Sequence, residues 1–230
     1  MLVTGSPVPG VEARRGSFAA LIRGALGDAW SGPVSVHDAQ QGELPDPSEI
    51  GALVITGSPA SVTSRAPWIL EAERAVAGIV RAGVPTLGIC LGHQLLGQAL
   101  GGLVEANPRG REMGSVPLRL LEADPLLGAA LSPFVANTSH RDSVTRLPPG
   151  ARVLAETELE PYAVVRFGPR TWGVQFHPEF DGEVMRGYID ARRDALSADG
   201  IDPETLQALD APEAARVLGT FARLAVESRF

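Results

Sequence analysis

Short apolar segments alternate with longer segments of helical period in the first part of the chain. The apolar segments that predict strands are residues 2–3, 34–37, 52–55 and 84–89. Residues 17–26 and 67–81 carry apolar side chains three and four positions apart, which predicts helices with one buried face. Strands separated by helices are typical of a parallel sheet with crossover helices. The pattern therefore predicts an α/β fold with an open, mostly parallel central sheet and flanking helices.

After a helix that begins near Gly92, the predicted strands become shorter and lie closer together. They are residues 103–105, 116–121, 134–136, 152–155, 162–167 and 171–176. The segments between them contain turn sequences such as LPPG and FGPR. We therefore expect an antiparallel extension of the parallel sheet.

The carboxyl end of the chain, from Asp181 onward, has a helical pattern that Pro203 interrupts. Its last predicted helix, residues 212–226, has an apolar face that could cover the core or contact a partner. The sequence contains no repeat of solenoid length and no linker that would divide it. We therefore expect one domain over residues 1–190 and a C-terminal helical arm over residues 191–230, packed on the same domain.

The composition excludes several kinds of chemistry. All 20 basic residues are arginine, so the chain can build neither the lysine of a P-loop nor a lysine Schiff base. With one cysteine and four dispersed histidines, we expect no internal disulfide, no metal site and no cofactor. The net charge of −7 disfavours nucleic acid and anionic lipid as partners, and the sequence predicts no signal peptide or membrane span. A cytoplasmic location is the corresponding expectation.

The tetrapeptide Thr-Gly-Ser-Pro occurs at residues 4–7 and again at residues 56–59, each time directly after a predicted strand. Loops that leave the carboxyl ends of parallel strands line the binding crevice of an open α/β sheet. We therefore expect both loops to face one site.

The sequence GICLGHQ, residues 88–94, predicts a buried strand that enters a small-residue turn and then a helix. Gly88 and Gly92 stand two positions on either side of Cys90, which allows the sharp elbow that exposes a nucleophile above a sheet. At the start of a helix, free N–H groups and the helix dipole favour the thiolate over the thiol. Cys90 is therefore the candidate nucleophile.

A thiolate nucleophile needs a proton shuttle, and His177 is the candidate because a carboxylate accompanies it. In the sequence WGVQFHPE, residues 172–179, His177 and Glu179 lie two positions apart on an extended segment, so their side chains leave the same face. Pro178 restricts the backbone between them, and Glu179 can set the tautomer and orientation of the imidazole. Cys90, His177 and Glu179 form the predicted catalytic set.

The motif GICLGHQ followed by WGVQFHPE resembles the class I, triad-type glutamine amidotransferase family, and the resemblance covers nearly all of residues 1–189. It implies a flavodoxin-like amidotransferase fold. It also implies that Cys90 attacks the side-chain amide of glutamine, that ammonia leaves and that water hydrolyses the glutamyl thioester. In that reaction His177 would transfer the protons and Glu179 would orient His177.

The tetrahedral intermediate of such a reaction needs hydrogen-bond donors for its oxyanion. The N–H of Leu91, directly after the nucleophile, is one candidate. The resemblance assigns the other donor to the loop after the preceding strand, where Gly57 is our choice. The candidate substrate-binding residues are Ser58, Gln94, Ser139 and His140, and the resemblance places the last three at the amino-acid end of glutamine.

Among subfamilies, the sequences REMG (residues 111–114) and TSHRD (residues 138–142) look most like the amidotransferase part of GMP synthase. Met113 stands where that subfamily usually has an aromatic residue, and Arg141 stands where it usually has glycine. His140 and Asp142 are also consistent with an ordinary polar turn. The chain contains no SGGxDS-like pyrophosphate-binding loop, so we expect any ammonia acceptor to be activated on a separate protein.

Three functions are consistent with this sequence. The first is a stand-alone glutamine amidotransferase or glutaminase that releases ammonia for a separate synthetase. The second is a γ-glutamyl peptidase acting on glutathione-like compounds, which differs in whether the leaving-group side of the pocket is open. The third is a non-catalytic binding or regulatory module of the same fold. The presence of Cys90, His177 and Glu179 together favours an enzyme.

Overall fold

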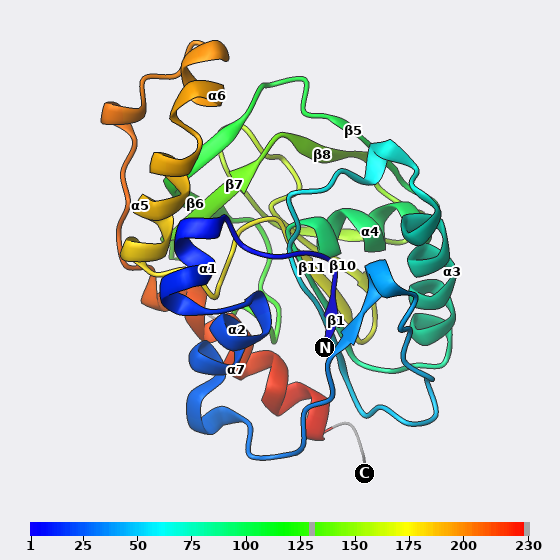
Figure 1. The fold of residues 1–230 in the computed structure, drawn as a ribbon. Coiled ribbons are helices and arrows are strands. Elements are labelled where there is room, and N and C mark those ends of the chain that lie inside the picture. Colours follow the sequence, from blue (N-terminus) through cyan, green and yellow to red (C-terminus); the bar gives the residue numbers. More distant parts are fainter. Residues whose placement is uncertain (129–131, 228–230) are drawn as a thin grey trace.

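The computed structural model describes residues 1–128 and 132–227. Its strands are β1 (Leu2–Val3), β2 (His37–Asp38), β3 (Leu53–Ile55), β4 (Thr86–Ile89), β5 (Leu103–Ala106), β6 (Glu112–Leu120), β7 (Phe134–His140), β8 (Asp142–Arg146), β9 (Arg152–Glu156), β10 (Val164–Gly168) and β11 (Thr171–Val174). Nine of them form one sheet in the order β2-β1-β3-β4-β11-β10-β9-β6-β7, and β5 pairs with β8 separately (Figure 1). The pairs from β2 to β11 are parallel, and those from β11 to β7 are antiparallel. The α/β class, the parallel centre and the antiparallel extension are thus confirmed.

Helices cover both faces of the sheet (Figure 1). They are α1 (Pro9–Arg15), α2 (Phe18–Leu26), α3 (Pro67–Arg81), α4 (Leu91–Ala99), α5 (Gly182–Ala191), α6 (Arg193–Ala198) and α7 (Pro212–Glu227), and the short 3₁₀ helices are η1 (Gly27–Ala29), η2 (Ala39–Gln41), η3 (Val62–Ser64) and η4 (Pro203–Thr205). Helices α3 and α4 share one buried cluster with Leu53 and Ile55 of β3. Helices α2 and α7 share another with Leu87 and Ile89 of β4. The two clusters follow from the alternation of side chains along each strand.

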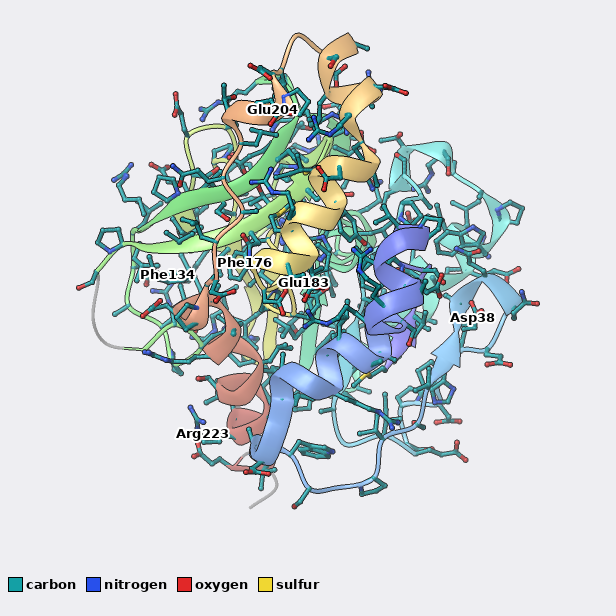
Figure 2. The ribbon with its side chains drawn as sticks, turned by 60° about the vertical axis from the view of Figure 1, so that its left-hand side comes forward. Asp38, Phe134, Phe176, Glu183, Glu204 and Arg223 are labelled. Atoms are coloured by element: carbon teal, nitrogen blue, oxygen red, sulfur yellow. The ribbon has the colours of Figure 1, made fainter. Side chains whose placement is uncertain are left out.

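The helical arm packs on the core, which was one of the two roles expected for it. Val217, Leu218 and Phe221 of α7 lie in the same buried cluster as Phe176. Figure 2 shows Phe176 and Phe134 near α7, and their rings meet edge to face with centroids 6.4 Å apart. The predicted interruption near Pro203 is also confirmed, because η4 separates α6 from α7. Residues 228–230 of the predicted arm lie outside the described residues.

The predicted strand at residues 34–37 is largely wrong, because β2 consists of His37–Asp38 alone. Its partner β1 has only two residues, so the ladder joins Leu2 to His37 and Val3 to Asp38 and then ends. Val36 is 45% exposed, so this side chain is not part of the buried core. The pattern also does not predict α1, since its Pro-Gly start resembles a turn, although proline suits the first helical position.

Two strands extend further than predicted, and a third is not predicted at all. Strand β6 begins at Glu112 rather than at residue 116, and β7 continues to His140 rather than to residue 136. The two pair in register from Glu112 opposite His140 to Leu118 opposite Phe134. The sequence pattern does not predict strand β8, because its sequence is DSVTR and Val144 is its one apolar residue. These changes place β6 and β7 next to the candidate site.

Candidate active site

Cys90 lies in the turn between β4 and α4, with φ of 50° and ψ of −103°. Such a positive φ is strained for a residue with a side chain and is characteristic of a nucleophile elbow. A Cβ on Gly88 would lie 2.4 Å from the backbone of Gly92, and one on Gly92 would lie 2.5 Å from the carbonyl oxygen of Ile55. Both glycines are therefore required by close approach of the backbone, and the predicted elbow is present.

The sheet brings His177 and Glu179 to Cys90. Strand β11 pairs in parallel with β4, so the segments that follow both strands leave the same edge of the sheet. His177 and Cys90 both adjoin Gly57, since a Cβ on this glycine would lie 2.7 Å from Cε1 of His177 and 3.6 Å from Cβ of Cys90. Nδ1 of His177 lies 2.8 Å from Oε1 of Glu179. All three side chains are buried, so their mutual charges are little screened by water.

This arrangement favours a thiolate and an imidazolium. Burial alone would lower the pKa of His177, but the charges of Glu179 and Cys90 and their hydrogen bonds outweigh it and raise the pKa to about 10. Burial alone would raise the pKa of the Cys90 thiol, but the charge and hydrogen bond of His177 outweigh burial and lower it. Each group therefore stabilises the charged form of the other, which is the condition for a reactive thiolate.

Aromatic rings that sequence reasoning missed hold His177 in place. The ring of Phe180 is stacked on the imidazole with centroids 4.0 Å apart, and those of Phe18 and Tyr188 lie at 6.1 Å and 6.3 Å. Phe18 comes from α2 and Tyr188 from α5, so the sequence around His177 does not predict that these rings contact it. Phe180 alone had a local signal, because it directly follows Glu179 of the motif.

The two Thr-Gly-Ser-Pro loops lie side by side, as expected. The hydroxyl of Thr4 donates to the carbonyl oxygen of Gly57 at 3.0 Å, and that of Ser58 donates to the carbonyl oxygen of Thr4 at 2.7 Å. These bonds fix Gly57 against the site, where an added Cβ would lie 3.6 Å from Cβ of Cys90. Leu91 begins α4, so its N–H has no partner within the helix. Gly57 and Leu91 thus both flank Cys90, and their role as oxyanion donors stays a prediction.

We predict that Gly57→Ala lowers kcat for the hydrolysis of γ-glutamyl substrates by about 10²- to 10³-fold, the effect expected for loss of an oxyanion donor. The new methyl group would lie 2.7 Å from Cε1 of His177, so the loop or the imidazole must move. Steady-state kinetics and a thermal melt measure the two effects. Gly78→Ala is the matched control, because its Cβ would meet nothing within 4 Å. Full activity of Gly57→Ala would contradict this role.

The candidate substrate-binding residues occupy different surroundings. Ser139 lies closest to the thiol, with its carbonyl oxygen 4.0 Å from Sγ of Cys90 and its buried hydroxyl unpartnered among the described residues. The amide nitrogen of Gln94 donates to the carbonyl oxygen of Asp142 at 2.8 Å. The hydroxyl of Ser58 accepts from the N–H of Ala60 at 3.1 Å, so it also shapes its own loop. Their binding of substrate stays a prediction.

His140 lies in a second buried group of charges, which sequence reasoning missed. Its Nε2 is 3.2 Å from Oε2 of Glu112, and its Nδ1 is 3.0 Å from the carbonyl oxygen of Asp142 and 3.9 Å from Oε2 of Glu160. Burial would lower the pKa of His140, but Glu112, Glu160 and Cys90 together raise it. Both ring nitrogens are therefore engaged by the protein. The charge of His140 also helps to lower the pKa of the Cys90 thiol.

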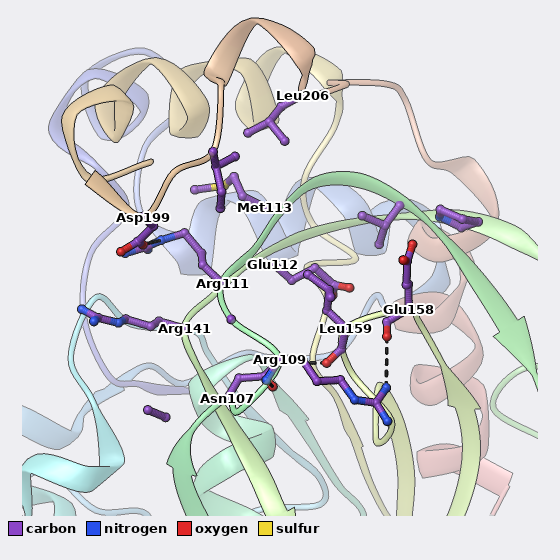
Figure 3. Close-up of a pocket in the computed structure, with 15 residues that line it drawn as sticks. Asn107, Arg109, Arg111, Glu112, Met113, Arg141, Glu158, Leu159, Asp199 and Leu206 are labelled. Carbon is purple, nitrogen blue, oxygen red and sulfur yellow. Dashed lines mark hydrogen bonds and ion pairs between the residues drawn. The ribbon is translucent and has the colours of Figure 1, made fainter. Parts of the chain in front are cut away.

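A cavity of about 590 Å³ has a lining that does not include Cys90, His177 or Glu179 (Figure 3). Its lining includes Arg111, which pairs with Asp199 at 2.6 Å, and Arg109, which donates to the carbonyl oxygen of Glu158 at 3.0 Å. A smaller cavity of about 140 Å³ is lined by His177 and Ser139. Because it touches two residues at the thiol, the smaller cavity is a candidate pocket for the part of a substrate that lies next to them.

The described part of the chain has neither a metal-binding cluster nor a membrane-spanning helix. No group of three His, Cys, Asp or Glu side chains is arranged to hold a metal ion there. No helix within residues 1–128 and 132–227 is long and apolar enough to cross a membrane.

Sequence comparisons place this site in a known family. The model of the family described as glutamine amidotransferase class-I matches residues 32–190, which is more than half of the chain. A GMP synthase [glutamine-hydrolyzing] from Aeropyrum pernix is 38% identical over 147 residues, 64% of this chain and 27% of that protein. One from Thermus thermophilus is 43% identical over 129 residues, 56% of this chain and 24% of that protein. The chain thus spans about a quarter of the length of these relatives.

Solved structures give the same fold. A glutamine amidotransferase from Methylobacillus flagellatus superposes with a TM-score of 0.72 at 24% identity, covering 98% of this chain and 90% of that chain. One from Thermotoga maritima superposes with a TM-score of 0.70 at 22% identity, covering 99% of this chain and 96% of that chain. The chain belongs to the class-I glutamine amidotransferase family.

Proposed function

We propose that the chain hydrolyses the side-chain amide of glutamine, or the γ-glutamyl bond of a related compound, through a thioester on Cys90. The observation that carries this proposal is the placement of Cys90 and His177 on either side of Gly57, with Nδ1 of His177 2.8 Å from the Glu179 carboxylate. A thiolate so paired is the activated form of a cysteine nucleophile.

The proposed reaction has two halves. Thiolate Sγ of Cys90 attacks the γ-carbonyl carbon, and the N–H groups of Gly57 and Leu91 stabilise the oxyanion. His177 donates its proton to the leaving nitrogen as the C–N bond breaks, so that ammonia or an amine departs. Water then attacks the thioester and gives its proton to His177, and glutamate and the thiolate are regenerated. This chemistry uses no cofactor or metal.

Release of ammonia and glutamate from glutamine, and of glutamate from glutathione, tests the proposal directly. We expect turnover of at least one of these substrates by the purified chain. Mass spectrometry of acid-quenched protein is expected to reveal a γ-glutamyl adduct on Cys90. A chain that gives neither turnover nor adduct would contradict the proposal and favour a non-catalytic binding module.

We further propose that ammonia released from glutamine passes to an acceptor carried by a separate synthetase. The relatives named GMP synthase [glutamine-hydrolyzing] are several times longer than the segment that they share with this chain, which supports an acceptor-activating part outside it. In this proposal residues 1–190 form the amidotransferase domain and residues 191–230 form a helical extension of it.

A further inference from the structure

The smaller cavity adjoins the imidazole of His177, which protonates the leaving group in the proposed reaction. Its lining includes His177 and Ser139 at the thiol, and also Val8, Pro59 and Tyr188. His177 gives its proton to the leaving nitrogen in the proposed reaction, so that nitrogen must face the imidazole and hence this cavity.

The cavity is larger than ammonia requires. A water molecule needs a cavity of about 10–15 Å³, and ammonia is of similar size. The cavity offers about 140 Å³, so an amine with several further heavy atoms can occupy it. Val8 and Pro59 supply apolar contact for the aliphatic part of such an amine.

Arg192 gives this cavity a positive charge that the protein leaves uncompensated. Its buried Nε has no hydrogen-bond partner among the described residues, and its guanidinium lies over the ring of Tyr188 at 5.6 Å. No acidic side chain is found among the described residues that line the cavity. Burial lowers the pKa of Arg192, but arginine stays protonated in proteins. A partly buried and unpaired cation is costly, and an anionic ligand would offset that cost.

Two other arginines of this region, in contrast, are paired with carboxylates. Arg193 pairs with Glu204 at 2.5 Å and with Asp190 at 3.1 Å, and Arg111 pairs with Asp199 at 2.6 Å. Arg192 lies at the end of α5, where its backbone N–H donates to the carbonyl oxygen of Ile189 at 3.1 Å. Arg192 lines the same cavity as His177 and Ser139, which lie at the thiol. The unpaired cation therefore shares one cavity with two residues of the candidate site.

We propose that this cavity binds the leaving amine of an extended γ-glutamyl substrate, and that Arg192 binds a carboxylate on that amine. The substrate class is γ-glutamyl amides of amino acids or short peptides. This inference rests on the proposed thioester chemistry and names the substrate for it. In the reaction the γ-glutamyl C–N bond breaks, the amine leaves with a proton from His177, and water supplies the oxygen of the glutamate product.

Paired substrates that differ only in the carboxylate test the role of Arg192. The main pair is γ-glutamylglycine and γ-glutamylglycinamide. The second pair, for a longer leaving group, is glutathione and the C-terminal amide of glutathione. We expect wild-type kcat/KM to favour the acid over the amide by about 10- to 100-fold, the range of a charge-assisted hydrogen bond. Arg192→Gln is expected to remove this preference, because the loss of kcat/KM falls mainly on the acids and much less on their amides. Arg193→Gln is the matched control and is expected to retain it.

An equal loss on every substrate in Arg192→Gln would overturn the inference, because a structural role or binding of the glutamyl α-carboxylate would act on all of them. Absence of any acid preference in the wild type would also overturn it. Calorimetric binding of γ-glutamylglycine and its amide to Cys90→Ala protein, with and without Arg192→Gln, separates this inference from the proposed function. Selective binding that depends on Arg192, without turnover by the wild type, would support the pocket and reject the chemistry. Turnover of glutamine without that selectivity would do the reverse.

Discussion

Replacement of Cys90 by alanine is expected to abolish hydrolysis of glutamine and of γ-glutamyl compounds, with a loss of at least about 10⁴-fold in kcat. The thiolate is the one nucleophile in contact with His177 in the proposed mechanism, and no thioester can form without it. Release of glutamate, followed by a coupled assay, measures the loss. Intact-protein mass spectrometry should find no γ-glutamyl adduct on the variant.

Cys90→Ser is the matched control for this experiment. The hydroxyl nearly preserves the volume of the buried thiol, so packing around the elbow is retained, but its far higher pKa leaves it un-ionised beside His177. We expect the serine variant to be inactive while its melting temperature stays close to that of the wild type. Substantial activity in Cys90→Ala would reject Cys90 as the nucleophile and would require another group in the site.

The elbow at Cys90 and the pair His177 and Glu179 could be predicted from local sequence signals. Gly88 and Gly92 allow a close backbone turn around Cys90, whatever the position of the strand in the sheet. The extended segment from His177 to Glu179 places these two side chains on the same face. The parallel pairing of β4 with β11 then follows from the fold class, because both are short buried strands. These parts of the site depend on few long-range contacts.

The rest of the site depends on contacts between distant segments. His140 meets Glu112 because β6 and β7 pair from Glu112 opposite His140, whereas the sequence pattern predicted that β6 starts later and that β7 ends earlier. Arg192 reaches the cavity because α5 packs beside the segment that carries His177, and nothing in its own neighbourhood distinguishes it from Arg193. An arginine becomes significant only when its lack of a partner is visible, which requires the three-dimensional arrangement.

Replacement of Glu179 by glutamine is expected to lower kcat at neutral pH by about 10³- to 10⁴-fold while leaving the fold intact. Glutamine keeps the size of the side chain and removes its charge. Burial lowers the pKa of His177, and the charge of Glu179 is the largest effect that opposes burial. Without that charge, His177 is expected to lose its proton near neutral pH. The Cys90 thiol then loses the cation that lowers its pKa.

The sign of the change at Cys90 is decided by two opposing effects of Glu179. Its negative charge directly raises the pKa of the thiol, but this is a smaller effect than the lowering by His177. The net result of Glu179→Gln is therefore a higher thiol pKa. Alkylation of Cys90 by iodoacetamide reports the thiolate directly. We expect alkylation of the wild type to reach its plateau at a lower pH than alkylation of the variant, because the lowered thiol pKa depends on the charge of Glu179 through His177. A variant with the wild-type pH profile would contradict the view that Glu179 sustains the Cys90–His177 ion pair.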